Sequence, residues 1–514
     1  MRAMKIWKNI TLVSKIAACL ILLSILLAQQ AGTTYGQGNW STPVPISPEG
    51  SFAWFPDVIA DQYGKVHTVW AAGATGYDQV IYTYTEDGKK WQPPNDVFAM
   101  PWVGTNSAAT RPALLIDENG YLNLSFVDLT TLYYSRSSLT KTLTANAWVP
   151  KQTMSGDQIA YYSRMAVDSN KKLHFVYTQS TPSEECALCY HLYYRQSAND
   201  GNTWSAPVDL MKGGSGAVKP QILIDRSDRV HVVWESGIGG GLGQLANPTS
   251  VSYSVSADSG KSWSSPENLS KNAAEMGKNI AIGLDRTGNV VVAWWALPAN
   301  KIMYQVSNHD GRGWTAPIPI SQVWGAAGVI RSNLDDYSFA TDSEGYLHLV
   351  VVGALSEFQT SLNILNLVWD GSQWAKPDVA ATFKGDVPEW PRVSISQGNQ
   401  LNVVWFVRDE AHIWESDKGQ YRVWYARGET GSKLIAPEPL PTAGSGITQS
   451  PSAPTQTAQP TRAATPLATS EPLTTTPRQV PQTEADFVPL LAIAILPSLL
   501  LIIGLAAFIS NRRQ

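Results

Sequence analysis

The chain has 514 residues, in which 38 Lys and Arg face 42 Asp and Glu, giving a formal net charge of −4. Only 16% of the residues are charged, which excludes a nucleic-acid binder that works through a general basic field. The length exceeds that of one ordinary domain, although repeat folds often form a single unit of this size.

Residues 1–36 are typical of an export signal. Lys5, Lys8 and Lys15 form a basic region, and the apolar run from Ile16 to Ala28 follows it. Thirteen apolar residues are too few for a bilayer span of about 20 residues. We therefore expect cleavage near this segment, at a bond that the sequence does not define, and an exported mature chain.

Between Asn39 and Arg427 one unit recurs seven times. Each copy contains a short apolar strand, a turn with Asp and often Gly, and a second apolar strand that often ends in an aromatic residue. The first copy runs from Pro56 to Trp70, and the others follow at intervals of 52 to 60 residues. Alternating apolar residues bounded by turn residues indicate strands and not helices.

A second element follows each copy: a Tyr-rich strand, a polar turn, and a Trp that opens a short fourth strand. One such Trp segment, Trp40 to Ser47, precedes the first full copy, whereas the last copy lacks a fourth strand. Pairing these two ends closes a ring and leaves no open sheet edge. We predict an all-β fold over residues 37–428, a seven-bladed β-propeller of four-stranded blades closed by an N-terminal strand.

The polar turn carries a family resemblance. Ser256 to Trp263 (SADSGKSW) resembles the Asp-box of sialidases and related propellers, Ser-x-Asp-x-Gly-x-Thr-Trp, and Ser197 to Trp204 and Ser307 to Trp314 are close relatives. In such a turn the Asp and Ser side chains bond local backbone amides, Gly takes a positive φ, and Trp packs between blades. The chain therefore resembles the sialidase-like (bacterial neuraminidase repeat) β-propeller superfamily.

The resemblance implies a fold more than an activity. Active sialidases grip the substrate carboxylate with three arginines and use a Tyr nucleophile with Glu and an Asp acid/base. Their Phe-Arg-Ile-Pro signature places the first arginine two residues before the first-strand Pro, where this chain has Trp54. Those enzymes are also six-bladed. We therefore do not expect a complete sialidase site.

Propellers bind ligands at the mouth of the central channel, where the first strands begin. The residues expected there mix aromatic and basic side chains, a combination that suits a sugar or an anionic glycan. The alternative is that Lys219 and Lys278 are solvated loop charges and that Trp54 and Trp390 cap blade cores. The candidate ligand-binding residues are Trp54, Arg111, Tyr162, Arg164, Lys219, Lys278, Trp390 and Arg392.

Candidates for catalysis are weaker. Asp335, Asp336 and Glu389 come from neighbouring blades and offer a carboxylate pair, whose separation the sequence does not give. We expect no cofactor and no metal, because no metal-binding or nucleotide-binding motif occurs in its required context. Cys186 and Cys189 are expected to form a disulfide in an exported chain.

Four histidines share one position in the second strands of their copies, which indicates a structural role. They are His67, His174, His231 and His348.

The C-terminal region differs from the repeats. Residues 429–486 are rich in Pro, Thr and Ser and nearly lack aromatic residues, which predicts a disordered stalk. Residues 487–510 are apolar enough for one transmembrane helix, and Arg512 and Arg513 predict that the tail, 511–514, is cytoplasmic.

These features predict a single-pass cell-membrane protein with an extracellular propeller. The favoured function is binding of an extracellular glycan or a protein partner, without nucleic acid. The first alternative is an exo-glycosidase that uses the channel-mouth carboxylates, and the second is a structural or assembly scaffold.

Overall fold

We describe the protein from a computed structural model. The structure describes residues 39–439 except 75, 102–109, 182–188, 212–215, 240–244, 271–275, 309, 327–333 and 413–420. The chain divides into two units, Met1–Pro441 and Thr442–Gln514, and the described residues all belong to the first. The predicted export signal, most of the stalk and the C-terminal apolar segment therefore lie outside the described residues. Within the described ranges, no helix has the length and apolar character of a membrane span.

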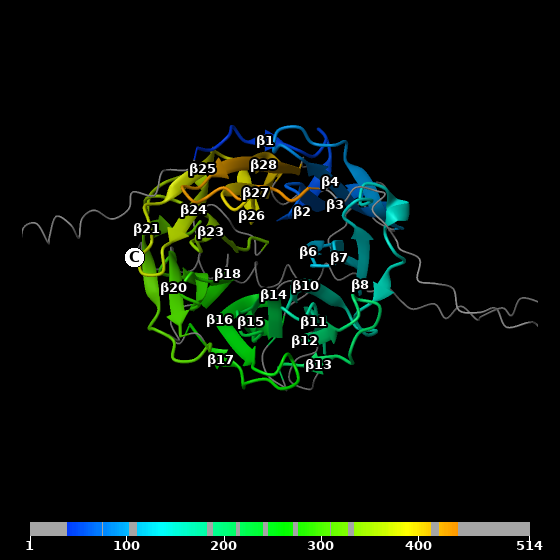
Figure 1. Cartoon of the computed structure of the whole chain (residues 1–514). Coiled ribbons are helices and arrows are strands. Elements are labelled where there is room, and N and C mark those ends of the chain that lie inside the picture. The colour runs from blue at the N-terminus through cyan, green and yellow to red at the C-terminus, as the bar shows by residue number, and fades with distance from the viewer. Residues whose placement is uncertain are drawn as a thin grey trace, which may run out of the picture. The chain divides into compact units, whose positions relative to one another are not determined.

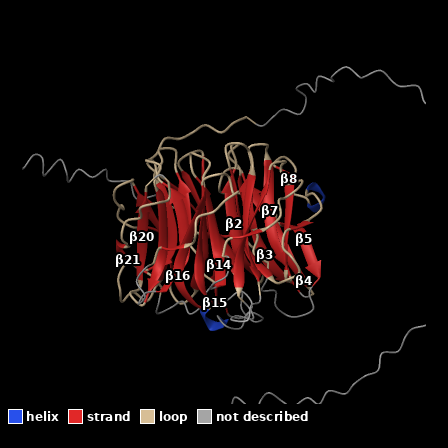
Figure 2. Cartoon of the chain, turned by 90° about the horizontal axis from the view of Figure 1, so that it is seen from below, coloured by secondary structure: helices blue, strands red, loops and turns tan. Residues whose placement is uncertain are grey.

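The described residues form seven four-stranded antiparallel sheets arranged as blades around an axis (Figure 1). The strands run roughly along this axis, as the side view shows (Figure 2). Neighbouring blades touch through their first strands, which therefore line the centre. We call the face where the first strands begin the upper face and the face where they end the lower face. The predicted all-β, seven-bladed propeller is confirmed.

The strands follow the same order in every blade, from the axis outward. The first strands are β2 (Phe52–Ala60), β6 (Ala113–Ile116), β10 (Ala160–Val167), β14 (Gly216–Ile224), β18 (Met276–Leu284), β22 (Ser338–Thr341) and β26 (Val387–Ser396). The second strands are β3 (Val66–Ala74), β7 (Tyr121–Asp128), β11 (Leu173–Ser180), β15 (Val230–Gly239), β19 (Val290–Leu297), β23 (Leu347–Gly353) and β27 (Gln400–Arg408).

The third and fourth strands form the outer part of each blade, and several of the fourth strands are only two residues long. The third strands are β4 (Tyr77–Thr85), β8 (Thr131–Ser138), β12 (Tyr190–Ser197), β16 (Leu245–Ser256), β20 (Lys301–Ser307), β24 (Leu362–Trp369) and β28 (Arg422–Glu429). The fourth are β5 (Asn95–Pro101), β9 (Gln152–Thr153), β13 (Val208–Asp209), β17 (Glu267–Asn268), β21 (Ile318–Trp324), β25 (Asp378–Phe383) and β1 (Val44–Pro45). Two 3₁₀ turns are also present, η1 (Ala145–Ala147) and η2 (Glu410–His412).

The ring closes as the repeat predicts. β1 is the outermost strand of the last blade, where Val44 pairs with Tyr425 and Pro45 with Trp424 on β28. Figure 1 shows this N-terminal strand in blue beside the orange β28. Further backbone bonds, from Ser41 to Arg427 and from Ile46 to Val423, extend the pairing at both ends. Closure in this way joins residues almost 400 positions apart and removes the open edge of the sheet.

The hydrophobic core lies between the blades. Each pair of adjacent blades encloses one cluster of buried apolar residues, because both faces of every sheet pack against a neighbour. The fourth-strand Trp packs edge-on against a third-strand Tyr of the preceding blade, for example Trp263 on Tyr194 and Trp314 on Tyr253, with ring centroids about 5 Å apart.

The polar turns between the third and fourth strands pack against the preceding blade on the lower face. In the turn from Ser256 to Trp263, Asp258 accepts backbone N–H bonds from Lys261 and Ser262 at 3.1 and 2.8 Å. Gly260 has φ +85°, and a Cβ there would lie 2.0 Å from the Tyr194 hydroxyl oxygen of the preceding blade. Glycine is therefore required twice at this position, for its backbone conformation and for the space that the tyrosine occupies.

The four equivalent histidines are structural, as predicted. In blade 3, His174 Nδ1 lies 2.7 Å from the Tyr194 hydroxyl and Nε2 lies 3.2 Å from Asp168. Asp168 also accepts the backbone N–H groups of its own turn, including that of Lys172. Blades 1, 4 and 6 repeat the Asp–His contact around His67, His231 and His348.

The packed chain continues past the predicted start of the stalk. Residues 430–439, which we call the strap, cross the lower face from blade 7 to blade 1. Ile435 N donates to the Gln397 carbonyl in the β26–β27 turn, and Glu438 N donates to the Gln62 carbonyl in the β2–β3 turn, both at 2.8 Å. The strap also reaches blade 6, where Ser432 Oγ donates to Asp342 at 2.5 Å. The strap therefore joins blade 7, in which the closing strand lies, to blades 6 and 1 on its two sides.

Candidate functional site

The side chains at the axis are placed there by bulges in the first strands. In β2, β14, β18 and β26 the pairing with the second strand shifts by one residue, and the bulged residue has a positive φ. A bulge with a left-handed residue turns its side chain away from the sheet face. It brings Phe55, Lys219, Asn279 and Trp390 toward the centre, with φ between +48° and +59°. A fifth bulge, in β10, shifts the pairing next to Tyr161 and Tyr162.

Aromatic rings fill the axis near the upper face. Trp390, from blade 7, stacks on Tyr162, from blade 3, with ring centroids 6.2 Å apart and an angle of 21°. Phe55, from blade 1, meets Trp390 edge-on at 5.2 Å. The Arg111 guanidinium lies over Phe55 and Tyr161 at 4.2 and 3.8 Å. Blades 3 and 7 are not neighbours, so these contacts run across the channel.

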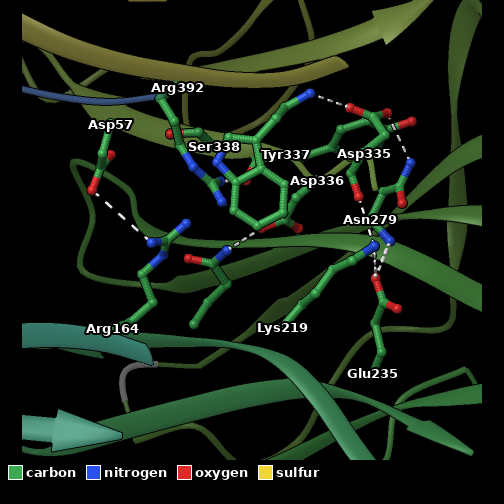
Figure 3. Close-up of polar contacts among 12 residues, drawn as sticks. Asp57, Arg164, Lys219, Glu235, Asn279, Asp335, Asp336, Tyr337, Ser338 and Arg392 are labelled. Carbon is green, nitrogen blue, oxygen red and sulfur yellow. Dashed lines mark hydrogen bonds and ion pairs between the residues drawn. The ribbon is translucent and has the colours of Figure 1, made fainter. Parts of the chain in front are cut away.

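A buried polar network continues beside the rings (Figure 3). Lys219 Nζ, from blade 4, donates to the Asp335 carbonyl in blade 6 at 2.7 Å and to Glu235 at 3.3 Å. Asn279 Nδ2 donates to Asp335 at 2.9 Å, while its backbone N–H donates to Glu235. The backbone N–H of Trp390 donates to the other Asp335 oxygen at 2.9 Å, so this carboxyl group holds the β26 bulge in place.

The other two candidate carboxylates are paired with arginines. Asp336 accepts from Arg392 at 2.7 Å and from the Gln221 amide at 2.8 Å. Glu389 accepts from Arg408 Nε at 2.5 Å and is fully buried. Buried ion pairs of this kind hold their side chains firmly, because losing either partner leaves an uncompensated charge.

Burial changes the charge of the network. Desolvation, followed by the negative charge of Glu389, raises the pKa of Asp335 to about 8, so this carboxyl group is mostly protonated at pH 7. Burial also raises the pKa of Glu235 and lowers that of Lys278. With Asp335 mostly protonated, the network carries one negative charge fewer at pH 7.

Arg164 is a partly exposed basic side chain of the network. Its guanidinium lies 4.0 Å from Asp57 and 5.7 Å from the Trp390 ring centroid. Burial and the nearby Arg392 cation lower the pKa of Arg164 to about 10, so it still carries its charge at pH 7. The side chains of Arg164 and Asp57 are 16% and 14% exposed, whereas those of Arg392, Asp336 and Glu389 are at most 4% exposed.

The burial of the first strands differs above and below the bulges. Residues before the bulges of β2, β10 and β14 are almost all buried, whereas residues after them, such as Ile59, Ala166 and Leu223, are only partly buried. The axis is therefore packed more tightly at the bulges than below them. Arg164 follows the β10 bulge and lies at this boundary.

The structure brings most of the predicted site residues together at the axis. Arg111, Tyr162, Arg164, Lys219, Asp335, Asp336, Glu389, Trp390 and Arg392 all belong to the rings and network described above. Lys219 and Lys278 are 3% and 7% exposed, so the alternative that they are solvated loop charges is wrong. Lys278 lies 4.6 Å over the Trp295 ring. Trp54 packs with Phe52 and Tyr421 and belongs to the core between blades 7 and 1.

Several residues of the network were not predicted. Glu235 directly follows the Trp that ends the apolar part of the second strand, and Asn279 occupies the same register position as Lys219 and Trp390. An alignment of the copies at the bulge would have identified Asn279 and Phe55. Asp57 and Gln221 are each the first paired residue after the bulge of their strand, and no sequence motif identifies them.

The predicted disulfide and the neighbouring His191 lie at the start of β12. Cys189 is disulfide-bonded, and Cys186 lies outside the described residues. His191 contacts Asp209 at 2.7 Å. Among the described residues there is no group of three or more His, Cys, Asp and Glu side chains arranged to hold a metal ion.

No known protein family and no curated protein matches the chain. Among solved structures, a protein of unknown function from Dyadobacter fermentans is 14% identical, with a TM-score of 0.46, covering 77% of this chain and 100% of that one. An ulvan lyase is 12% identical, with a TM-score of 0.47 and coverages of 73% and 95%.

The NanB sialidase of Streptococcus pneumoniae is 13% identical, with a TM-score of 0.42 and coverages of 75% and 70%. Sialidases and polysaccharide lyases are therefore both among the solved structures to which the chain is similar. The propeller architecture that the turn motifs implied is confirmed by the seven four-stranded sheets described above.

Proposed function

We propose that this protein binds an acidic glycan at the axis of the propeller and that Arg164 contacts the glycan's anionic group. The observation that carries the proposal is the position of Arg164: a charged and partly exposed guanidinium below the β10 bulge, 4.0 Å from the Asp57 carboxylate. A carboxylate or sulfate group of a ligand can accept two parallel hydrogen bonds from a guanidinium. Asp57, at 4.0 Å, is too far from Arg164 to accept such a pair.

The neighbouring groups favour a sugar over a simple ion. The indole of Trp390 lies beside Arg164 and Arg392, at 5.7 and 4.3 Å from their guanidinium carbons. The Trp390 ring is itself only 2% exposed and packs against Tyr162 and Phe55, so it supports the two guanidinium groups and is not a stacking surface. Gln221 and Ser338 occupy the same register position as Arg164 on their own strands and add amide and hydroxyl groups.

Binding is favoured over catalysis because the candidate carboxylates are occupied. Asp336 and Glu389 each accept hydrogen bonds from buried arginines, and Asp335 accepts two hydrogen bonds within the network. We further propose that the chain is exported and anchored by its C-terminal apolar segment, so that the propeller meets extracellular glycans. The composition of residues 1–36 and 487–510 supports this part of the proposal.

One observation favours a second function, glycoside hydrolysis. A carboxyl group with a pKa of about 8 beside a second carboxylate, Glu389, resembles the acid of a glycosidase pair. The full-length protein should be applied to an array of acidic and neutral glycans and to a panel of fluorogenic glycosides. We expect the protein to bind acidic glycans without hydrolysing any glycoside.

Glycoside hydrolysis that disappears in Asp335→Asn would establish the hydrolase instead. Binding to neutral glycans alone would refute the role of Arg164.

A further inference from the structure

A second polar pocket lies on the lower face, at the junction of blades 1 and 2. Its volume is about 440 Å³, and it is lined by Lys65, two tyrosines of β4 and the connection Leu139–Ala147. Lys65 belongs to the β2–β3 turn, and the connection joins β8 to β9. The pocket is therefore formed by outer strands and turns, separate from the network at the axis.

The pocket exists because blade 2 departs from the repeat. At corresponding junctions a glycine in the polar turn of the following blade packs directly against the third-strand tyrosine. Gly260 packs against Tyr194 in this way, and Gly311 against Tyr253. In blade 2 the connection contains η1 and no glycine. The Thr142 hydroxyl meets the Tyr82 hydroxyl at 2.5 Å instead, and the space beside it is left open.

The lysine at this junction makes a different contact from its counterpart in blade 3. Lys172, at the equivalent turn position of blade 3, donates to Ser259 in the turn of blade 4 at 3.1 Å. Lys65 faces the pocket, and its ion pair within the described residues is with Glu86, at 3.5 Å, whose side chain is 64% exposed. An exposed ion pair of this kind contributes little and is exchanged easily. The Lys65 ammonium is therefore available to an incoming anion.

The remaining lining suits a polyhydroxylated ligand. The Lys65 ammonium lies 4.9 Å from the centre of the partly buried Tyr84 ring, so cation and ring are presented together. Thr144, Asn146 and Lys141 are exposed at the pocket wall and offer hydroxyl, amide and ammonium groups. The floor is rigid, because Tyr82 is bonded to both His67 and Thr142. We propose that this pocket is a second binding site, for an acidic sugar residue of a glycan chain.

The test uses the full-length protein and a tetrasaccharide of alternating glucuronate and N-acetylglucosamine. Hydrogen exchange of residues 139–147 reports the pocket directly, and calorimetry gives the affinity. We expect the tetrasaccharide to slow exchange there, and Lys65→Gln to weaken this effect by roughly tenfold, as the loss of a charged hydrogen bond does. Lys172→Gln is the matched control and should leave the effect unchanged.

Three further arms separate the outcomes. Arg164→Gln should leave the protection of residues 139–147 intact, which distinguishes this pocket from the axial site whether or not the axial site binds. A neutral chitin tetrasaccharide should protect weakly, and inorganic phosphate should not protect. Equal protection by phosphate would overturn the assignment to a sugar. Unchanged exchange of residues 139–147 at saturating tetrasaccharide, or an equal loss in Lys65→Gln and Lys172→Gln, would overturn the site.

Discussion

Trp390 has a φ of +59°, a backbone conformation that large side chains rarely adopt. Two features maintain it. Its backbone N–H donates to Asp335 at 2.9 Å, and its ring packs against Tyr162, Phe55 and Arg392. The geometry of the candidate site therefore depends on the carboxyl group of Asp335, whose protonation is sensitive to pH.

This dependence gives a pH prediction. The pKa of Asp335 is raised to about 8 in the folded protein, so between about pH 4 and pH 8 the folded state holds a proton that the unfolded state has lost. The stabilising contribution is complete below about pH 4 and is lost as the pH rises toward 8, with a limiting slope of about 1.4 kcal/mol per pH unit.

Denaturation curves of wild type and Asp335→Asn between pH 5 and pH 9 measure this effect. We expect the wild type to lose stability relative to the variant as the pH rises. The same comparison made with Asp57→Asn controls for a general effect of removing an acid near the axis. Parallel curves for wild type and Asp335→Asn would show that Asp335 is already ionised at pH 5.

At the scale of the elements, the turn glycines are the points where neighbouring blades are closest. Gly260→Ala introduces both a strained backbone and a clash with the Tyr194 hydroxyl. Gly120→Ala is a matched control, because Gly120 has a similar φ, +77°, and no heavy atom within 4 Å of the added Cβ.

Thermal unfolding should separate these two contributions. We expect Gly120→Ala to cost about 1 kcal/mol and Gly260→Ala about 3 kcal/mol or more. Combining Gly260→Ala with Tyr194→Phe should recover little of the difference, because the ring carbons Cζ and Cε1 would still lie 2.3 and 2.5 Å from the added Cβ. Equal losses in the two single variants would mean that the tyrosine does not press on the turn.

The strap makes a second prediction at this scale. Ser432 is buried and supplies a donor to Asp342, which also accepts from His348. In blade 3 the equivalent Asp168 receives this donor from Ser259 in the turn of the next blade. The strap thus replaces the turn that blade 7 lacks, because the closing strand β1 comes from the other end of the chain.

Ser432→Ala in the full-length protein should lower the free energy of unfolding by about 1–3 kcal/mol, the usual cost of an unsatisfied buried group. Ser51→Ala, which removes an exposed hydroxyl bond to Pro48, is the control and should have little effect. If Ser432→Ala is as stable as wild type, the strap does not contribute to closure.

For the molecule as a whole, the sequence was sufficient to predict the blades and their closure. The Trp of the fourth strand and the Asp of the first turn recur in nearly every copy because each blade makes the same contacts with its neighbour. Blade number follows from counting these residues, and closure follows from the unmatched Trp40 segment.

The axial site was only partly predictable. Its members could be recognised as residues near the start of the first strands, but their contacts run between blades 1, 3, 4, 5, 6 and 7 and depend on bulges that shift the register by one residue. No local pattern reports on such distant pairs, so the burial of Lys219 and the roles of Glu235 and Asn279 were not evident. The strap was missed because its Pro-containing sequence is typical of a disordered segment.

The central claim is that Arg164 recognises the anionic group of a glycan at the axis. The most direct measurement is a calorimetric titration of an acidic oligosaccharide, selected on the glycan array, into the full-length wild type, Arg164→Gln and Arg195→Gln. Arg195 is a partly buried arginine on β12 of the same blade and bonds backbone carbonyls away from the axis. We predict a loss of affinity of roughly tenfold or more in Arg164→Gln and none in Arg195→Gln. Equal affinity in all three proteins would contradict the account.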